Sequence, residues 1–242
     1  MFHVKHFNII KEPMMDFTPF FEKYELLAGK ADEAFNRIKN THPDLVLCEP
    51  GCTDCCYALF DLTLVEAMYL NTRFNELFTG ESREALLEKA NRTDRQLYKL
   101  KRAAYEATKE GKDETEVVED MAKERVECPL LNKDSRCDLY AYRPIACRVY
   151  GVPMAIGGAG RTCGLSGFKA GTQYPTINMD VIHNQLLAIS TELVQSLETK
   201  HPGLSEVLVP VSMALLTDYN EEYLGLKIAA REVTDKQENT GE

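Results

Sequence analysis

The sequence predicts a mainly α-helical fold, a single helical domain that spans residues 1–242 and surrounds an irregular region. Three observations lead to this expectation. Apolar residues recur at steps of three and four along most of the chain. The stretch from about 128 to 176 is instead punctuated by prolines and glycines, and all eight cysteines lie between Cys48 and Cys163. A chain of 242 residues can bury one substantial core without disulfides, so the cysteines call for another explanation.

The first half of the chain carries four helical patterns. Phe20, Tyr24 and Leu27 open the apolar face of the first, which His42-Pro43 ends. The second begins with Thr63-Leu64-Val65-Glu66, which has the form of a capping box. The third has an apolar inner face and an outer face rich in Lys, Arg and Glu. The predicted ranges are 16–40, 64–78, 86–104 and 117–126.

The second half begins as loop and returns to helix. Residues 128–176 are predicted to be mostly loop, with a short β-hairpin near 148–163 and a turn at the glycines of 157–160. Helical patterns resume after Asn178 and again over 212–231. We expect residues 1–15 to form an N-terminal arm and residues 232–242 a frayed tail.

Composition bears on where the protein acts and on what it binds. A net charge of −10 disfavours binding to nucleic acid or to an anionic membrane, because both contacts depend on basic surface. No apolar run approaches the roughly 20 residues of a membrane helix, and the first residues do not read as a signal peptide. The sequence therefore predicts a cytoplasmic protein that binds neither nucleic acid nor a membrane. In a reducing compartment, clustered cysteines favour metal binding over disulfides.

The cysteines form two blocks, at 48–56 and 128–163. Thiolates are soft donors that suit zinc or iron–sulfur clusters. The spacing lacks the paired Cys-x-x-Cys knuckles of a zinc ribbon. Adjacent Cys55 and Cys56 side chains leave the backbone in different directions, which suits two sites or two irons of one cluster. The predicted metal ligands are Cys48, Cys52, Cys55, Cys56, Cys128, Cys137, Cys147 and Cys163.

Two family resemblances concern these cysteines. Cys48-x3-Cys52-x2-Cys55 has the spacing of radical S-adenosylmethionine enzymes, although Asp54 stands where that family usually has an aromatic residue. Both blocks together, with Cys128-Pro-Leu-Leu, Cys137-Asp-Leu-Tyr and Arg143-Pro-Ile-Ala-Cys-Arg, resemble the YkgJ-type cysteine cluster family of zinc- or iron-chelating proteins. That resemblance covers about residues 48–163. It implies metal or iron–sulfur ligation by these cysteines, and relatives with the same block include flagellin lysine methylases.

Arg143 and Arg148 are the remaining candidates for cofactor binding. A [4Fe–4S] cluster with four thiolates carries a charge of about −2 or −3, and guanidinium groups beside it would stabilise the reduced state. The alternative is that Arg143 pairs with a surface carboxylate and Arg148 caps a loop.

Three functions remain open from the sequence. The first is a protein that holds an iron–sulfur cluster through both blocks, with a redox, sensing or accessory role and a protein or redox partner. The second is a structural zinc protein with two four-cysteine sites. The third is a cluster-dependent enzyme, such as a relative of protein methyltransferases, for which an open coordination position beside a cavity would be the mark.

Overall fold

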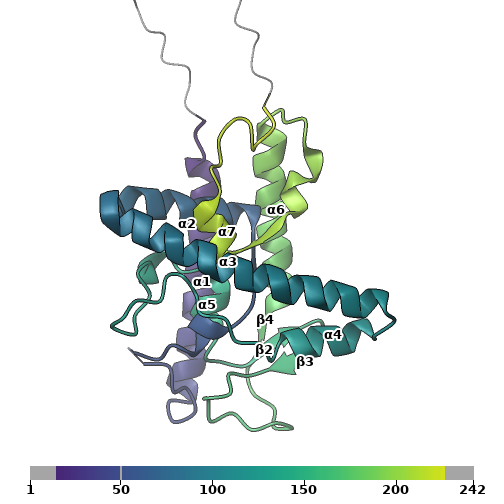
Figure 1. Cartoon of the computed structure of the whole chain (residues 1–242). Coiled ribbons are helices and arrows are strands. Elements are labelled where there is room, and N and C mark those ends of the chain that lie inside the picture. The colour runs from purple at the N-terminus through teal and green to yellow at the C-terminus, as the bar shows by residue number, and fades with distance from the viewer. Residues whose placement is uncertain (1–14, 50, 227–242) are drawn as a thin grey trace, which may run out of the picture.

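The structure is a computed structural model that describes residues 15–49 and 51–226 (Figure 1). The expected N-terminal arm, apart from Met15, and the expected tail at 232–242 lie outside the described residues. The fold is mainly helical, as the sequence predicts. Its α-helices are α1 (Thr18–Thr41), α2 (Leu64–Leu77), α3 (Gly80–Lys109), α4 (Glu114–Met121), α5 (Ile145–Val149), α6 (Met179–Ser196) and α7 (Val211–Leu216).

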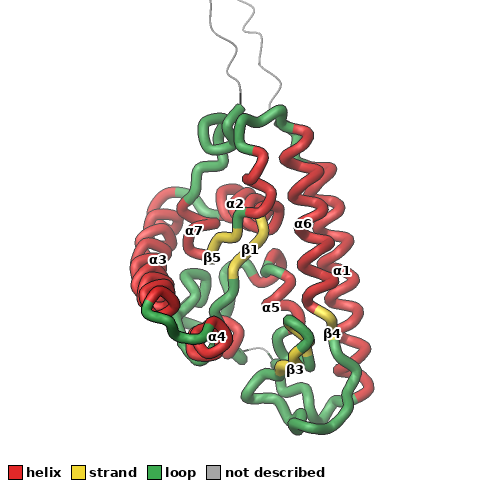
Figure 2. Tube along the Cα trace, turned by 90° about the vertical axis from the view of Figure 1, so that its right-hand side faces the viewer, coloured by secondary structure: helices red, strands yellow, loops and turns green. Residues whose placement is uncertain are grey.

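The long helices give the molecule its shape. Helices α1 and α6 run side by side, and α3 crosses in front of them with α4 beside its far end (Figures 1 and 2). One hydrophobic cluster joins α1, α2, α5 and α6 around residues such as Tyr24, Val65 and Leu193. A second joins α2, α3 and α7 around Phe74 and Ala90. Because α2 contributes to both clusters, it links the two halves of the core.

The start of α2 confirms the capping box. Thr63 is the N-cap residue, and the Glu66 side chain accepts a hydrogen bond from the Thr63 backbone N–H at 3.4 Å. Leu64, Val65 and Ala67 are buried directly after the cap, so the helix enters the core at its first turn. Strand β1 (Asp61–Thr63) precedes the cap and pairs antiparallel with β5 (Leu208–Pro210), a pairing that the sequence did not predict.

The predicted β-hairpin is present. Strands β2 (Met154–Ile156) and β3 (Ala159–Arg161) pair antiparallel, and β4 (Ile177–Asn178) pairs with β2 in parallel. Gly157 and Gly158 form the turn with φ angles of 58° and 75°, which glycine adopts without strain. The Asn178 side chain then caps α6 by accepting from the N–H groups of Asp180 and Val181.

The last predicted helix, over 212–231, is correct at its start but wrong from residue 217 within the described residues. Helix α7 ends at Leu216, and Thr217 has extended backbone angles. Asn220 Oδ1 accepts a hydrogen bond from the Tyr223 N–H at 2.9 Å, so a side chain takes the donor that a continuing helix would use. Residues 227–231 of that prediction lie outside the described residues.

Two other helices differ in their bounds from the sequence prediction, and α3 extends beyond the expected 86–104 at both ends. The helix expected over 117–126 is α4, which begins earlier because Asp113 caps it by accepting from the Thr115 and Glu116 N–H groups. The segment 128–176 is mostly loop, as expected, and it also contains the short helix α5. Three 3₁₀ turns complete the described fold, at Asp54–Tyr57, Tyr140–Tyr142 and Pro202–Glu206.

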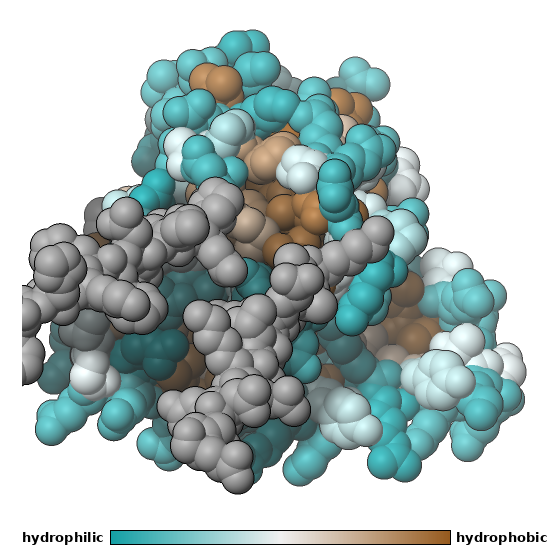
Figure 3. Space-filling view, turned by 90° about the horizontal axis from the view of Figure 1, so that it is seen from above, coloured by the Kyte–Doolittle hydropathy of each residue, from teal (hydrophilic) through white to brown (hydrophobic). Residues whose placement is uncertain are grey.

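The surface of the described chain is mixed in character. Viewed from above, hydrophilic side chains surround a smaller apolar area (Figure 3). Among the residues that the structure describes, none of the helices combines the length and the hydropathy that a membrane span requires.

Candidate metal centre

The two cysteine blocks meet around one cavity of about 710 Å³. Helix α1 forms one wall through Phe35 and Lys39, and α3 forms another through Thr93 and Leu97. The two cysteine-bearing segments close the remaining sides, and every cysteine except Cys163 lines the cavity. All eight cysteines are free thiols. The predicted convergence of the blocks is therefore present in the fold.

Backbone hydrogen bonds bring the blocks together. The Cys128 N–H donates to the Cys56 carbonyl at 2.7 Å, and the Val126 N–H donates to the Tyr57 carbonyl at 3.3 Å. Leu131 and Cys137 form an antiparallel bridge that folds the second block back on itself. These contacts fix three cysteines of the two blocks relative to one another without any metal.

Five cysteines make up what we call the inner group: Cys55, Cys56, Cys128, Cys137 and Cys147. Within this group the Cys55 sulfur accepts hydrogen bonds from the thiols of both Cys147 and Cys56. The other members are linked electrostatically, because Cys137 raises the pKa of Cys128 and both raise the pKa of Cys147. The inner group draws two thiols from the first block and three from the second.

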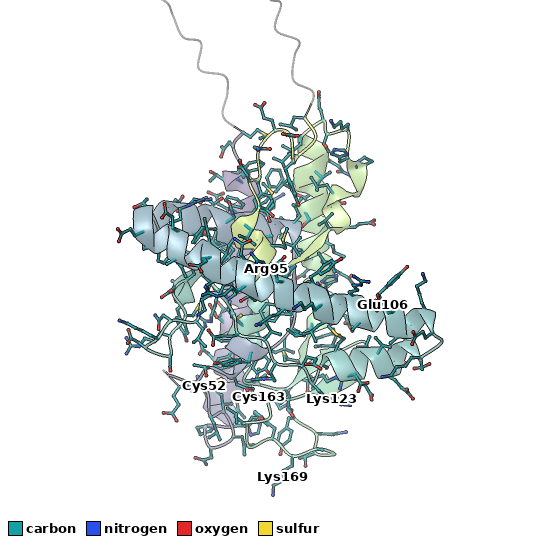
Figure 4. All side chains as sticks on the ribbon, viewed as in Figure 1. Cys52, Arg95, Glu106, Lys123, Cys163 and Lys169 are labelled. Carbon is teal, nitrogen blue, oxygen red and sulfur yellow. The ribbon has the colours of Figure 1, made fainter. Side chains whose placement is uncertain are left out.

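The other three cysteines, Cys48, Cys52 and Cys163, lie together with Asp54, and we call this set the outer group. Cys163 donates a hydrogen bond from Sγ to Asp54 Oδ2 at 3.3 Å, and its charge interacts with Cys52. Cys48 contacts Cys52 through a hydrogen bond between their thiols. Cys52 and Cys163 lie in the lower half of the molecule, below α3 (Figure 4).

The ionisation of the thiols differs sharply within the inner group. Burial raises the pKa of Cys128 to about 12 and that of Cys137 to about 11. The pKa of Cys55 is lowered to about 3, first by the hydrogen bonds from Cys147 and Cys56 and also by the positive charge of Arg143. These shifts favour the thiolate at Cys55 and the neutral thiol at its neighbours. Metal binding would release protons from the others, because only thiolates are good ligands.

The two arginines have different surroundings. Arg148 donates from Nε to the Arg143 carbonyl at 2.9 Å, from Nη2 to the Ala141 carbonyl at 2.8 Å and from Nη1 to Asp32 Oδ2 at 2.5 Å. Arg148 therefore ties the loop before α5 to α1. This arrangement matches the loop-capping alternative more closely than direct contact with a cofactor.

Arg143 faces the thiols more directly. Its guanidinium lies over the Tyr140 ring at 4.1 Å from the ring centre, and 3.7 Å separates Nη2 from Asp32 Oδ1. Its charge lowers the pKa of Cys55 and opposes the rise in the pKa of Cys137. Arg143 is the arginine whose charge acts on the inner group.

Three features of the site were not recognised from the sequence. Asp54 is fixed by Arg125, which pairs with its carboxylate and donates to its backbone carbonyl at 2.9 Å. Gly151 lies so close to Cys48 that an added Cβ would be 2.2 Å from the Cys48 sulfur. Glu66, recognised only as part of a capping box, also contacts α5. Each of these three features depends on a contact between segments that are distant in the sequence. The capping box at Glu66 was the one local signal that pointed to any of them.

The donor set fits a thiolate-bound metal or cluster. Four thiolates are what a [4Fe–4S] cluster or a structural zinc ion takes, and the inner group supplies five in one cavity. As the described side chains stand, no three His, Cys, Asp or Glu residues are arranged to hold a metal ion. Binding would therefore require the thiols to turn towards one another.

Comparison with known proteins adds no relative. No family model matches the chain, and no curated protein or solved structure matches it either.

Proposed function

We propose that the chain binds an iron–sulfur cluster, of the [4Fe–4S] type, through cysteines of the inner group. The observation that carries the proposal is that five thiols from the two blocks surround one cavity, with an arginine charge acting on them. Such a cluster carries one electron at a time. The resemblance to the YkgJ-type cysteine cluster family supports the same ligand chemistry.

The proposed role is electron transfer, redox sensing or support of a partner enzyme in the cytoplasm. The helices would serve as scaffold and shield, since α1 and α3 form walls of the cavity. Arg143 would favour the more negative, reduced state of the bound group through its charge. Cys48, Cys52 and Cys163 remain available as ligands of a second site with Asp54.

Metal analysis of anaerobically prepared protein tests the proposal. We expect iron and inorganic sulfide in the ratio of a [4Fe–4S] cluster, a brown colour, and an electron paramagnetic resonance signal after reduction. A colourless protein that holds stoichiometric zinc and no iron would overturn the proposal. That result would favour the structural zinc function instead.

Two serine variants test which group holds the cluster. Cys147→Ser removes a thiol from the inner group, and Cys163→Ser removes one from the outer group. We expect Cys147→Ser to lose iron and to melt at a lower temperature, because ligation and folding are coupled. Cys163→Ser serves as the control and should keep its iron. Equal iron loss in both variants would show that the division into groups does not describe the cluster ligands.

A second candidate function is a cluster-dependent enzyme. The observation that favours it is the cavity, whose volume of about 710 Å³ lies in the range of small-molecule pockets. Catalysis would need a coordination position left open by the cysteines. An electron paramagnetic resonance spectrum that changes when S-adenosylmethionine is added would favour an enzyme, and an unchanged spectrum would leave the carrier role.

A further inference from the structure

Glu66 is a buried carboxylate that joins two elements distant in sequence. Only 5% of the residue is exposed. One carboxylate oxygen, Oε2, accepts from the Thr63 N–H at 3.4 Å and from the Thr63 hydroxyl at 3.3 Å. The other, Oε1, accepts from the Ile145 N–H at 3.1 Å. The same carboxylate thus caps α2 and holds the first residue of α5.

Helix α5 needs such an anchor. It has five residues, too few to be stable by itself, and it carries Cys147 at its centre. Its first N–H groups have no partner within the helix, and Glu66 satisfies that of Ile145. The Ile145 and Val149 side chains are fully buried on either side of Cys147. The position of Cys147 therefore depends on contacts made by its neighbours.

Arg148 holds the same helix from its other side. Its guanidinium binds two backbone carbonyls of the preceding loop and Asp32 of α1. Cys147 thus lies between Ile145, which Glu66 ties to α2, and Arg148, which Asp32 ties to α1. Glu66 itself lies outside the cavity, so it does not compete as a ligand.

Burying a carboxylate is costly, which suggests a specific purpose for this one. Burial is the largest influence on the side chain and raises the pKa of Glu66 to about 7, while the Ile145 and Thr63 hydrogen bonds and the charge of Arg148 act in the opposite direction. A capping residue can perform its task at the surface without this cost. The contact that requires burial is the one with Ile145.

We propose that Glu66 is a positioning residue of the metal centre, which orients Cys147 towards the inner group by anchoring α5. The inference rests on the proposed function, because it assumes that Cys147 is a ligand. Loss of a group that orients a ligand without touching the metal commonly lowers metal affinity about 10- to 100-fold.

Cobalt(II) binding to reduced, metal-free full-length protein tests this role, because thiolate-to-cobalt absorption reports the ligands directly. Glu66→Met keeps the volume of the side chain and removes both acceptor oxygens. We expect it to bind cobalt(II) about 10- to 100-fold more weakly. Glu66→Gln keeps one acceptor oxygen for Ile145 and should restore most of the affinity. If Glu66→Met does not fold, Glu66→Asp, whose carboxylate is one methylene shorter, should show the weakened binding.

Thr63→Ala is the matched control. It removes the hydroxyl that donates to Glu66 and lowers the stability of α2, but it leaves the Ile145 contact in place. We expect its cobalt(II) affinity to be unchanged. Affinity that falls in Thr63→Ala as much as in Glu66→Met would overturn the positioning role, since stability alone would then explain the effect. Wild-type protein that binds neither cobalt(II) nor iron would overturn the proposed function, and the positioning role with it.

Discussion

Replacement of Gly151 by alanine should displace the Cys48 thiol. The Ala Cβ would lie 2.2 Å from Cys48 Sγ, 3.1 Å from Cys48 Cβ and 3.4 Å from the Phe35 ring. Ordinary contacts of this kind are about 3.5–4.0 Å, so the sulfur must move by about 1.5 Å. Rotation of the Cys48 side chain relieves the closest contact, but its Cβ remains too near. The variant therefore removes Cys48 from its place in the outer group.

The expected loss of stability follows from two opposing effects. Overpacking of this kind costs about 1–3 kcal/mol. The backbone of Gly151 is not in the left-handed region, so alanine also restricts the unfolded chain and returns about 0.4–1 kcal/mol. The net destabilisation is about 1–2 kcal/mol, which lowers the melting temperature of a chain of this size by about 2–8 °C.

Thermal melting of the reduced, metal-free protein measures this effect. Gly164→Ala is the matched control, because it is also a loop glycine next to a cysteine segment and a Cβ there meets nothing within 4 Å. We expect the control to melt at or slightly above the wild-type temperature. If Gly151→Ala and Gly164→Ala melt together, the close approach between Gly151 and Cys48 does not exist in solution.

Three further predictions concern ionisation and the core. Below about pH 6, where ordinary thiols are protonated, iodoacetamide should label Cys55 ahead of the other cysteines, and Cys147→Ala should slow that labelling; mass spectrometry of the peptides measures it. Because burial raises the pKa of Glu66 from 4.5 to about 7, the native state retains a proton that the unfolded state releases between those pH values. Stability should therefore fall by about 3 kcal/mol as the pH rises from 4.5 to 7, and the difference between wild type and Glu66→Gln in urea unfolding should show this slope. Phe74→Ala should cost about 3–5 kcal/mol in the same assay, since Phe74 of α2 is fully buried against α3 and α7, and a loss under 1 kcal/mol would contradict the packing.

Local signals predicted most of the helices correctly because burial and periodicity agree there. The apolar face that begins with Tyr24 and Leu27 is buried in α1, and Thr63 and Glu66 start α2 as a capping box. The glycines at 157 and 158 turn the β-hairpin for the same reason that glycines do in any short hairpin. In each case residues that are neighbours in the sequence are sufficient to determine the local structure.

The misjudged parts have causes that lie elsewhere in the chain. Strand β1 has three residues, too few for an alternating pattern, and its partner β5 is in the last quarter of the sequence. The pattern after Ser212 is helical in periodicity, but Asn220 takes up a backbone N–H and the helix stops at Leu216. Periodicity does not register this competition between side chain and backbone.

The cysteines show the same limit within the site. The expectation of one site shared by both blocks agrees with the cavity that both blocks line, but the sequence did not indicate which thiols would be neighbours. Cys163, the last in the sequence, lies beside Asp54 of the first block, whereas Cys147 lies beside Cys55. The division into inner and outer groups depends on how α5 and the hairpin fold back, which no local pattern specifies.

The location of the cysteines suggests how metal binding and folding are coupled. Helix α5, which carries Cys147, packs into the hydrophobic cluster of α1 and α6 through Ile145 and Val149, while Cys128 and Cys137 pack against the cluster of α2, α3 and α7. The cavity lies between these clusters, which otherwise share α2 and a few side chains. An iron–sulfur cluster bound by inner-group thiols from both sides would join the two halves of the hydrophobic core across the cavity. Metal release should therefore loosen the α3 side relative to the α1 side, because the cross-link between them is lost while each hydrophobic cluster keeps its own contacts.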